Sequence, residues 1–145
     1  MSASPVRPAV VADAADIHAL LLKLAGEIPL TIETLEQEEA LYAAIRKILA
    51  FGQSWVAVAD EAVTGVALVD SAEVGRHWGE NELLNLRYAL GEMLDELIGK
   101  VVERNVPITA SIRDSNRTGL AERLLRFGFR ETETRVGERH FRYDP

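Results

Sequence analysis

Two neighbouring stretches of this chain carry side chains that exchange protons near neutral pH. His77 and Trp78 stand in the polar stretch GRHWGENE, Glu82 ends it, and Tyr88 follows six residues later. A histidine is a good base near neutral pH, a carboxylate can take a proton through water, and a tyrosine hydroxyl can donate one. These residue types favour general acid–base chemistry. The alternative is an ordinary loop and strand, because isolated acids are mostly exposed and tyrosines mostly pack with a wet hydroxyl.

Several other chemistries are excluded by the composition. The chain has no cysteine, which rules out a thiolate nucleophile, a thiolate zinc site and disulfides. Its three histidines are scattered, which argues against a histidine-rich metal site, and we interpret His18 and His140 as structural. The sequence has no serine–histidine–acid spacing, Walker-type loop or metal-ligand cluster.

Length and composition predict one domain over residues 1–145, long enough to bury a sizeable core. No apolar stretch approaches the ~20 residues of a membrane span, and the N-terminal MSASPVRPA lacks the apolar region of a signal peptide. We therefore expect a cytoplasmic protein without a membrane segment.

Charge is distributed unevenly along the chain. The net charge is −7, which argues against nonspecific nucleic-acid binding. Residues 113–145 carry eight Arg against six acids, whereas the remainder carries eight basic and 17 acidic residues. The arginine-rich end is suited to phosphates or an acidic partner; we favour a solvated face.

Hydrophobic periodicity and capping signals predict the element order. Asp13 reads as the N-cap of a first helix, and Thr34–Gln37 is the capping box of a second. Asp60-Glu61 reads as the tight turn of a hairpin. The remaining predicted elements are a strand over Val6–Val11, hairpin strands over Ser54–Ala59 and Val63–Asp70, a strand over Pro107–Ile112, a helix over Asn116–Phe127 stopped by Gly128, and a final hairpin of Phe129–Val136 and Arg139–Tyr143.

The segment from residue 80 to residue 104 allows two interpretations. The alternation of Leu84, Leu86, Tyr88 and Leu90 predicts a strand with one apolar face, followed by a helix over Glu92–Arg104. The same apolar residues also follow a helical stripe, which predicts a single helix from about 80 to 104. The flanking pattern favours a strand followed by a helix.

The order of these elements resembles the GNAT superfamily, the acetyl-CoA-dependent N-acyltransferases, along nearly the whole chain. VRPAVVADAADIHALL resembles its opening strand and first helix, SWVAVADEAVTGVALVD its second and third strands, and RLLRFGF its last helix and Gly-Phe corner. The resemblance implies an α/β (α+β) fold with a central mixed, mostly antiparallel sheet of six or seven strands, flanked by four helices. It also implies that the fourth and fifth strands splay apart around the pantetheine arm of coenzyme A.

The turn that holds the pyrophosphate in this family is degenerate in this chain. Family members carry Gln/Arg-x-x-Gly-x-Gly/Ala there, and its backbone N–H groups and the following helix N-terminus bind the anion. Only Arg87 and Gly91 remain, at the wrong spacing. Glu92, Asp95 and Glu96 open the next helix, where they would repel a pyrophosphate. A cofactor would depend on backbone amides and on arginines from elsewhere in the fold.

The last helix departs from the family as well. The tyrosine that many members use as general acid falls on Leu124, which cannot protonate a thiolate. The family's asparagine falls on Arg117, with Asn116 beside it. Asn116 can bind the pantetheine arm, but we favour a helix cap for it.

The resemblance implies a set of site residues. Glu82 would be the catalytic base, and Tyr88 would supply the missing acid. Acetyl-CoA would be held by Leu86, Arg87, Tyr88, Gly91 and Asn116, with backbone N–H groups around Leu86–Tyr88 on the thioester carbonyl. His77 and Trp78 would line the acceptor pocket.

Two functions of different classes follow. The first is an N-acyltransferase that uses acetyl-CoA, needs no metal, and acetylates an amine of a small molecule or a protein by direct attack. The second is a catalytically inactive GNAT-like module that binds a protein, because fold does not determine function. The altered turn favours the second function, and the base rate of the fold places the enzyme slightly ahead. A homodimer or a protein partner stays open.

Overall fold

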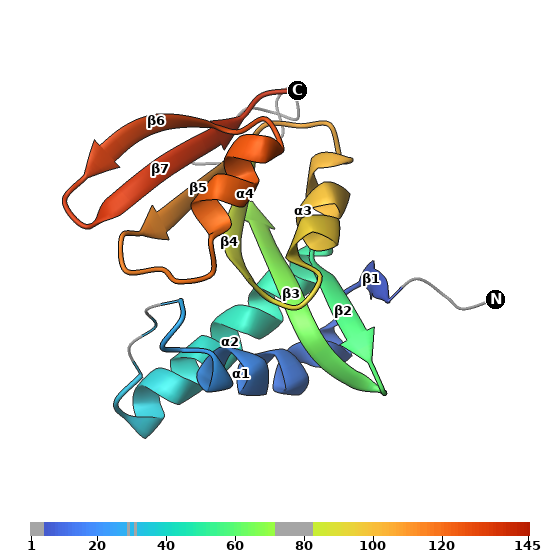
Figure 1. The fold of residues 1–145 in the computed structure, drawn as a ribbon. Coiled ribbons are helices and arrows are strands. Elements are labelled where there is room, and N and C mark those ends of the chain that lie inside the picture. Colours follow the sequence, from blue (N-terminus) through green and yellow to red (C-terminus); the bar gives the residue numbers. More distant parts are fainter. Residues whose placement is uncertain (1–4, 29, 31, 72–82) are drawn as a thin grey trace.

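One open, twisted sheet forms the centre of the protein, and helices cover both of its faces (Figure 1). The computed structural model describes residues 5–28, 30, 32–71 and 83–145. The strands are β1 (Val6–Pro8), β2 (Trp55–Ala59), β3 (Ala62–Ser71), β4 (Leu84–Gly91), β5 (Ile108–Arg113), β6 (Arg130–Arg135) and β7 (Glu138–Tyr143). The helices are the 3₁₀ turn η1 (Val11–Asp13), α1 (Ala14–Lys23), α2 (Leu35–Phe51), α3 (Leu94–Val102) and α4 (Leu120–Arg126). None of these described helices has the length and apolarity that a membrane crossing needs.

The strand order in the sheet is β1-β2-β3-β4-β5-β7-β6. Every neighbouring pair is antiparallel except β4 and β5, which are parallel. A parallel pair requires a crossover connection, and α3 supplies it between β4 and β5. The predicted mixed, mostly antiparallel sheet with four flanking helices is therefore confirmed.

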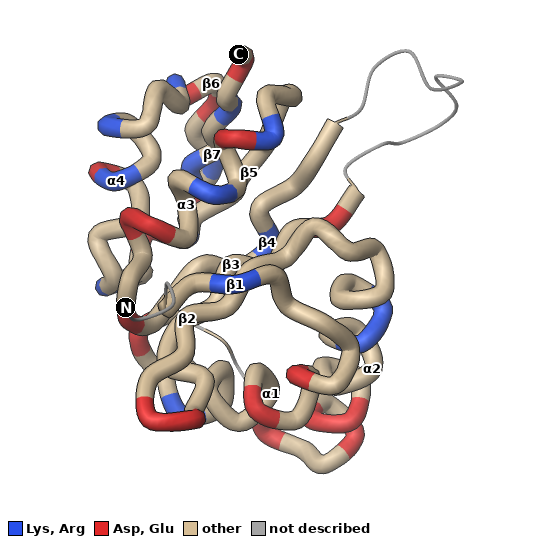
Figure 2. The backbone as a smooth tube through the Cα atoms, turned by 90° about the vertical axis from the view of Figure 1, so that its right-hand side faces the viewer, with Lys and Arg blue, Asp and Glu red and all other residues tan. Residues whose placement is uncertain are grey.

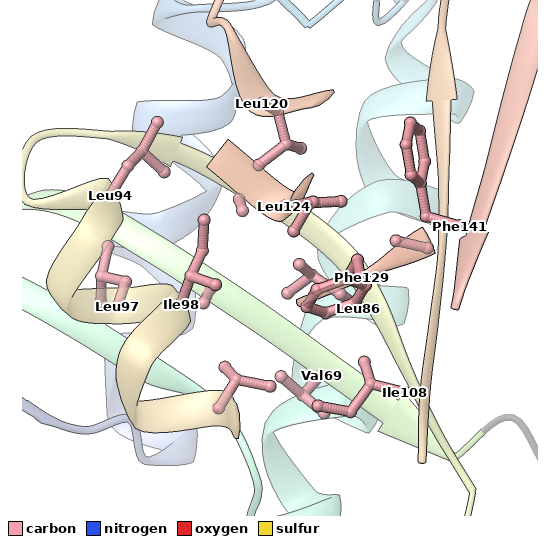
Figure 3. Close-up of a cluster of buried hydrophobic side chains, with 14 of the residues drawn as sticks. Val69, Leu86, Leu94, Leu97, Ile98, Ile108, Leu120, Leu124, Phe129 and Phe141 are labelled. Atoms are coloured by element: carbon pink, nitrogen blue, oxygen red, sulfur yellow. The ribbon is translucent and has the colours of Figure 1, made fainter. Parts of the chain in front are cut away.

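The sheet separates two hydrophobic clusters. Helices α1 and α2 cover one face, where Ile17 and Ile45 pack against Val66 and Leu68 of β3. Helices α3 and α4 cover the other face. Figure 3 shows this second cluster, with Leu94, Leu97 and Ile98 of α3, Leu120 and Leu124 of α4, and Phe129, Phe141, Val69, Leu86 and Ile108 from the strands and the turn beside them. The two helical layers hold β3 and β4 between them, whereas the apolar side chains of β5 lie under α3 and α4 alone.

The ambiguous segment forms a strand and then a helix. Strand β4 pairs with β3 from Leu84↔Ser71 to Gly91↔Gly65, and α3 begins three residues after β4 ends. The single-helix alternative is therefore wrong. A helix is unfavourable here because β3 has a long edge of backbone N–H and C=O groups, and a helix over residues 84–91 would leave those groups without hydrogen-bond partners.

The predicted single apolar face of β4 is also wrong. The register with β3 shifts between Leu68↔Tyr88 and Val69↔Leu86, so Arg87 is an extra residue on β4. A bulge of one residue moves the following side chains to the opposite face of a strand. Accordingly, Leu86 lies in the cluster under α3 and α4, whereas Tyr88 and Leu90 pack in the cluster under α1 and α2.

The start of the chain differs from the prediction in two ways. Strand β1 ends at Pro8, and Val11 opens η1 rather than continuing the strand. Asp13 does not cap α1 with its side chain. Instead its carboxylate accepts a hydrogen bond from the backbone N–H of Val10 at 2.8 Å and two from the guanidinium of Arg7 at 2.9 Å each. Asp13 therefore ties η1 to β1.

The pairing of Asp13 predicts a loss of stability in acid. The Arg7 hydrogen bond is the largest cause of a lowered Asp13 pKa, and the Val10 N–H lowers this pKa further. A carboxyl with a lowered folded-state pKa contributes stability that is present above the unfolded value of about 3.9 and is lost as pH falls through the folded value. We expect Asp13→Asn to lower the free energy of unfolding at pH 7 by about 1–3 kcal/mol. Urea titrations at pH 7 and below pH 4 should show the deficit shrinking with acid, and an equal deficit at both pH values would contradict the pairing.

The last helix is shorter than predicted. Helix α4 begins at Leu120, so Asn116 is not its N-cap. The side-chain oxygen of Asn116 instead accepts hydrogen bonds from the N–H of Thr118 at 2.9 Å and from its hydroxyl at 2.7 Å. This local turn satisfies the side chain before the helix starts. Gly128, at φ +98°, ends the helix as predicted, and the N–H of Phe129 returns to the carbonyl of Leu124.

Candidate active-site cleft

Strands β4 and β5 diverge after three residue pairs. Their parallel pairing covers Leu84↔Ile108, Asn85↔Thr109 and Leu86↔Ala110. A cleft of about 280 Å³ lies where the strands diverge. Its walls are Asn85–Ala89 of β4, Ser111–Arg113 of β5, Ile28 and Leu30 of the α1–α2 connection, Asn116, Leu120 and Glu138. The divergence opens a concave site in the middle of an otherwise continuous sheet.

The bulge of β4 lies at this point of divergence. Arg87 has no partner on β3 in the register, because Leu86 and Tyr88 pair with consecutive residues of that strand. A bulge locally interrupts the ladder of backbone hydrogen bonds. Backbone N–H groups that face a cleft can stabilise negative charge on a carbonyl oxygen. The backbone from Leu86 to Tyr88 is thus placed where such a donor is useful.

Four of the residues singled out by sequence come together on the cleft wall. Leu86, Arg87, Tyr88 and Asn116 all line it, and the guanidinium of Arg87 lies 5.6 Å from the centre of the Tyr88 ring. Gly91 is not among the cleft residues. The other three residues, Glu82, His77 and Trp78, lie outside the described residues.

Gly91 lies at the far end of β4, where the backbone turns into α3. Its φ is +88°, and a Cβ added there would overlap the carbonyl oxygen of Thr64 on β3. The next N–H, that of Glu92, donates to the same Thr64 carbonyl at 2.9 Å. The backbone of the turn therefore packs directly against the backbone of β3. Gly65 lies opposite, and a Cβ there would in turn overlap the Glu92 carbonyl.

A second cavity, of about 490 Å³, borders this turn. Thr64, Gly91 and Glu92 form one side of it, and Lys23 and Arg123 bring positive charge from α1 and α4. If this turn is to hold an anion, arginines must reach it from elsewhere in the fold. Arg123 lies in such a position, although it also has a partner within the protein.

That partner is Asp95 in the first turn of α3. Asp95 accepts hydrogen bonds from Arg123 at 2.7 Å and from Arg126 at 3.5 Å. The Arg123 hydrogen bond is the largest cause of a lowered Asp95 pKa. The carboxylate that would repel an anion at this helix N-terminus is thus largely neutralised by α4, and it joins the two helices that cover one face of the sheet.

The arginine-rich C-terminal part is ion-paired over much of its surface. Acidic residues gather at the start of α2 and on the β2–β3 turn, whereas arginines alternate with acids over α4, β6 and β7 (Figure 2). Arg139 pairs with Glu131 at 2.9 Å, and this hydrogen bond, with one from Thr134, lowers the pKa of Glu131 to about 2. Arg130 and Arg142 share Asp144, and Arg135 pairs with Glu133. The favoured interpretation, a solvated face, agrees with these pairs.

A group of side chains at the edge of the cleft was not predicted from the sequence. The hydroxyl of Ser111 on β5 lies 3.0 Å from Nδ1 of His140 on β7, and Glu138 Oε1 lies 3.7 Å from Nε2 of the same ring. Ser111 and His140 face each other in the β5–β7 register. They are 29 residues apart, so no short spacing could reveal them. The alternation of Glu138 and His140 on one strand face was the only local signal.

Within the part of the chain that the structure describes, no three His, Asp or Glu side chains gather as a metal site. Helix α4 carries Leu124 at the place of the family's tyrosine, and this side chain is fully buried. The polar side chains on the described cleft wall are those of Asn85, Arg87, Tyr88, Ser111, Arg113, Asn116 and Glu138, and Ser111 connects the cleft to His140.

No protein-family model matches the sequence, and no protein of curated function matches it. Solved structures do match. The polyamine N-acetyltransferase of Drosophila melanogaster superimposes with a TM-score of 0.72 at 14% identity, covering 97% of this chain and 99% of the other. A GNAT-family acetyltransferase of Streptococcus agalactiae gives 0.69 at 16% identity, covering 97% and 94%. The PaiA N-acetyltransferase of Thermoplasma acidophilum, solved with coenzyme A, gives 0.64 at 11% identity, covering 97% and 98%. With its diverging β4 and β5 and these neighbours, the chain has the fold of the GNAT superfamily.

Proposed function

We propose that this protein is an N-acetyltransferase that transfers the acetyl group of acetyl-CoA to an amine. The cleft between β4 and β5, with a bulge at its apex, is the observation that carries the proposal. An acyl transfer needs a donor at the thioester carbonyl and a path by which the amine approaches it. Backbone N–H groups around Leu86–Tyr88 would serve as the donor, and the open cleft would serve as the path.

The pantetheine arm would lie between β4 and β5, with Asn116 and Arg87 as polar contacts. The pyrophosphate would lie in the second cavity near Gly91, where Lys23 and Arg123 offset the acids of the turn. The amine would attack the thioester directly, because the chain has no cysteine to carry the acyl group. Tyr88 would protonate the departing thiolate, Glu82 would act as a base, and His77 and Trp78 would border the acceptor.

The structural neighbours support an amine as acceptor. They include a polyamine N-acetyltransferase and an agmatine N-acetyltransferase, and a NatC complex bound to a peptide. Small cationic amines and protein N-termini are therefore both reasonable acceptors for this chain. The wall of the cleft carries Glu138, whose carboxylate suits a cationic acceptor, and Arg87, which suits an acidic one.

Acetyl-CoA binding is the direct test of this proposal. We expect a micromolar dissociation constant and 1:1 stoichiometry by calorimetry. Ligand at 100 times its dissociation constant should stabilise the native state by about 2.7 kcal/mol and raise the melting temperature. Glu82→Gln should bind acetyl-CoA normally while losing turnover with an amine panel.

Two lysine variants sharpen this test. Lys23→Ala should weaken binding, because Lys23 borders the second cavity. Lys47→Ala, which removes an exposed charge from α2, should bind like the wild type. An absence of binding at millimolar acetyl-CoA would overturn the enzyme proposal.

One observation favours the second function, a binding module without catalysis. The Glu92 N–H in the turn is already bonded to Thr64, so one amide of the expected pyrophosphate site is occupied. Leu124 is buried where the family places its acid. If acetyl-CoA does not bind, this module becomes the better description.

A further inference from the structure

The face of β5 and β7 that is turned away from α3 and α4 carries a connected row of polar side chains. The alternating residues Ile108, Ala110 and Ile112 of β5 point into the core under α3 and α4. Ser111 therefore points to the opposite face, where it meets His140 across the ladder. Glu138 precedes His140 by two residues on β7 and shares this face.

The position of Ser111 along β5 places its hydroxyl at the apex of the cleft. Ala110 is the last β5 residue paired with β4, and Ser111 comes next. The bulged Arg87 follows Leu86, which is the partner of Ala110, on the other wall. Ser111 and the backbone proposed to hold the thioester carbonyl thus lie on opposite walls of the cleft. Each comes directly after the last residue pair that joins β4 and β5.

Two contacts bear on which nitrogen of His140 carries the proton. Glu138 Oε1 lies 3.7 Å from Nε2, an ion-pair distance rather than a hydrogen bond, and the buried Nε2 has no hydrogen-bond partner among the described residues. An ionised carboxylate accepts hydrogen bonds and does not donate them, so it favours a proton on the facing Nε2. With that tautomer, Nδ1 would hold a lone pair and accept the Ser111 O–H, whose oxygen lies 3.0 Å away. The oxygen lone pairs of Ser111 would then be available to the cleft.

Resting on the proposed acetyl transfer, we infer that Ser111 is a catalytic residue that relays a proton from the attacking nucleophile to His140, with Glu138 as the positioning residue of the imidazole. Once Glu82 has taken the extra proton of the ammonium form, the neutral amine attacks the acetyl carbon. As the nitrogen–carbon bond forms, the nitrogen gives one proton to Ser111 Oγ while the Ser111 proton moves to His140 Nδ1. The carbon–sulfur bond then breaks and the thiolate leaves. The imidazolium returns this proton through Ser111 to the departing thiolate, the step for which Tyr88 is the alternative donor, so the relay regains its starting state after each transfer.

Three elements bring charged or titratable groups to His140. Glu138 faces it from β7, Glu133 lies opposite it in the β6–β7 register, and Ser111 contacts it from β5. The Glu133 pKa is lowered mainly by the hydrogen bond from Arg135 and also by the charge of His140. The ring therefore lies near two carboxylates, and one of them, that of Glu133, is itself paired with Arg135.

The state of the imidazole can be measured without any ligand. In ¹⁵N-labelled protein, we expect His140 to show the Nε2–H tautomer with an unprotonated Nδ1. Ser111→Ala should shift the Nδ1 resonance, and Thr134→Ala, which removes an exposed hydroxyl from β6, should leave it unchanged. A dominant Nδ1–H tautomer in the wild type would overturn the relay, because Nδ1 could then not accept the proton.

The second measurement follows the release of coenzyme A from acetyl-CoA, with water alone and with agmatine, spermidine and a peptide N-terminus as nucleophiles. Ser111→Ala and His140→Gln should each lower kcat about 10²-fold, with an unchanged KM for acetyl-CoA. Ser111→Thr should restore most of the rate, and the double variant should be no slower than either single one. Both single variants should lose the fall in kcat/KM at acidic pH that a histidine base would give the wild type.

The outcomes separate the relay from the proposed function. If the wild type turns over and Ser111→Ala retains kcat within about twofold with the same pH profile, the relay is overturned and the acetyltransferase stands. If the wild type neither binds nor turns over acetyl-CoA, both are overturned, even where the nuclear magnetic resonance spectra show the expected tautomer.

Discussion

Leu124→Ala should lower the free energy of unfolding by about 2–5 kcal/mol, the cost of removing a buried leucine and leaving a cavity. Leu124 is fully buried on α4 and packs in the cluster with Ile98 and Phe129 (Figure 3). This prediction concerns function as well as stability, because the residue stands where the family's proton donor would stand. Urea unfolding monitored by circular dichroism measures the change.

The neighbouring residue is a matched control for this substitution. Leu125 is 46% exposed on the same helix, so Leu125→Ala should change the free energy of unfolding by no more than about 0.5 kcal/mol. Leu124→Tyr should also destabilise, by about 1–3 kcal/mol, because the packed cluster has no room for the larger ring and its hydroxyl. A stable Leu124→Tyr with faster turnover would show that position 124 reaches the cleft and would contradict the packing described above.

Gly91→Ala should be the second severe substitution. The positive φ of Gly91 costs an L-residue about 1–2 kcal/mol, and the new Cβ would overlap the carbonyl of Thr64. Relief of that overlap requires movement of one of two backbones, which adds about 1–3 kcal/mol. The turn between β4 and α3 would be displaced, so we expect acetyl-CoA binding to weaken in parallel.

Gly52→Ala isolates the first of these two costs. Gly52 ends α2 with φ +82°, and an added Cβ would meet no atom within 4 Å. The free energy of unfolding of Gly52→Ala should therefore fall only by the cost of a positive φ in an L-residue, about 1–2 kcal/mol. The free energies of unfolding lost by the two variants, measured by heat and urea, should differ by the cost of the Cβ overlap alone. Equal losses would show that the turn moves to relieve the overlap without a measurable cost.

Asp95 gives the acids of α3 a role that the sequence did not indicate. They suggested a free helix end that is hostile to an anion, and in the structure Asp95 ties α3 to α4 through Arg123 and Arg126. An anion in the second cavity would compete with Asp95 for Arg123. A phosphate group bound in that cavity would therefore be coupled to the contact between the two helices on this face.

About half of the candidate site was accessible from sequence. The resemblance led to Leu86, Arg87, Tyr88 and Asn116, and all four line the cleft. It did not lead to Ser111, His140 and Glu138, because their proximity depends on the β5–β7 register. A contact between residues 29 positions apart produces no local sequence pattern, whereas a family motif consists of residues close together in the sequence.

Local signals by themselves determined much of the fold. The capping box Thr34–Gln37, the turn at Asp60-Glu61 and the corner Gly128-Phe129 each depend on atoms a few residues apart, and all three appear as predicted. Residues 84–91 form the strand that the flanking pattern favoured, whereas only the tertiary structure decided that Arg87 forms a bulge and that Asn116 makes a turn rather than a cap. The apolar pattern of β4 satisfies both a helix and a strand, and the choice between them was made by the hydrogen-bonding edge of β3. The bulge in the β3–β4 pairing also places the Tyr88 side chain on the opposite face of the sheet and lies where the cleft opens. A bulge depends on the register of two strands, so the sequence of one strand does not reveal it.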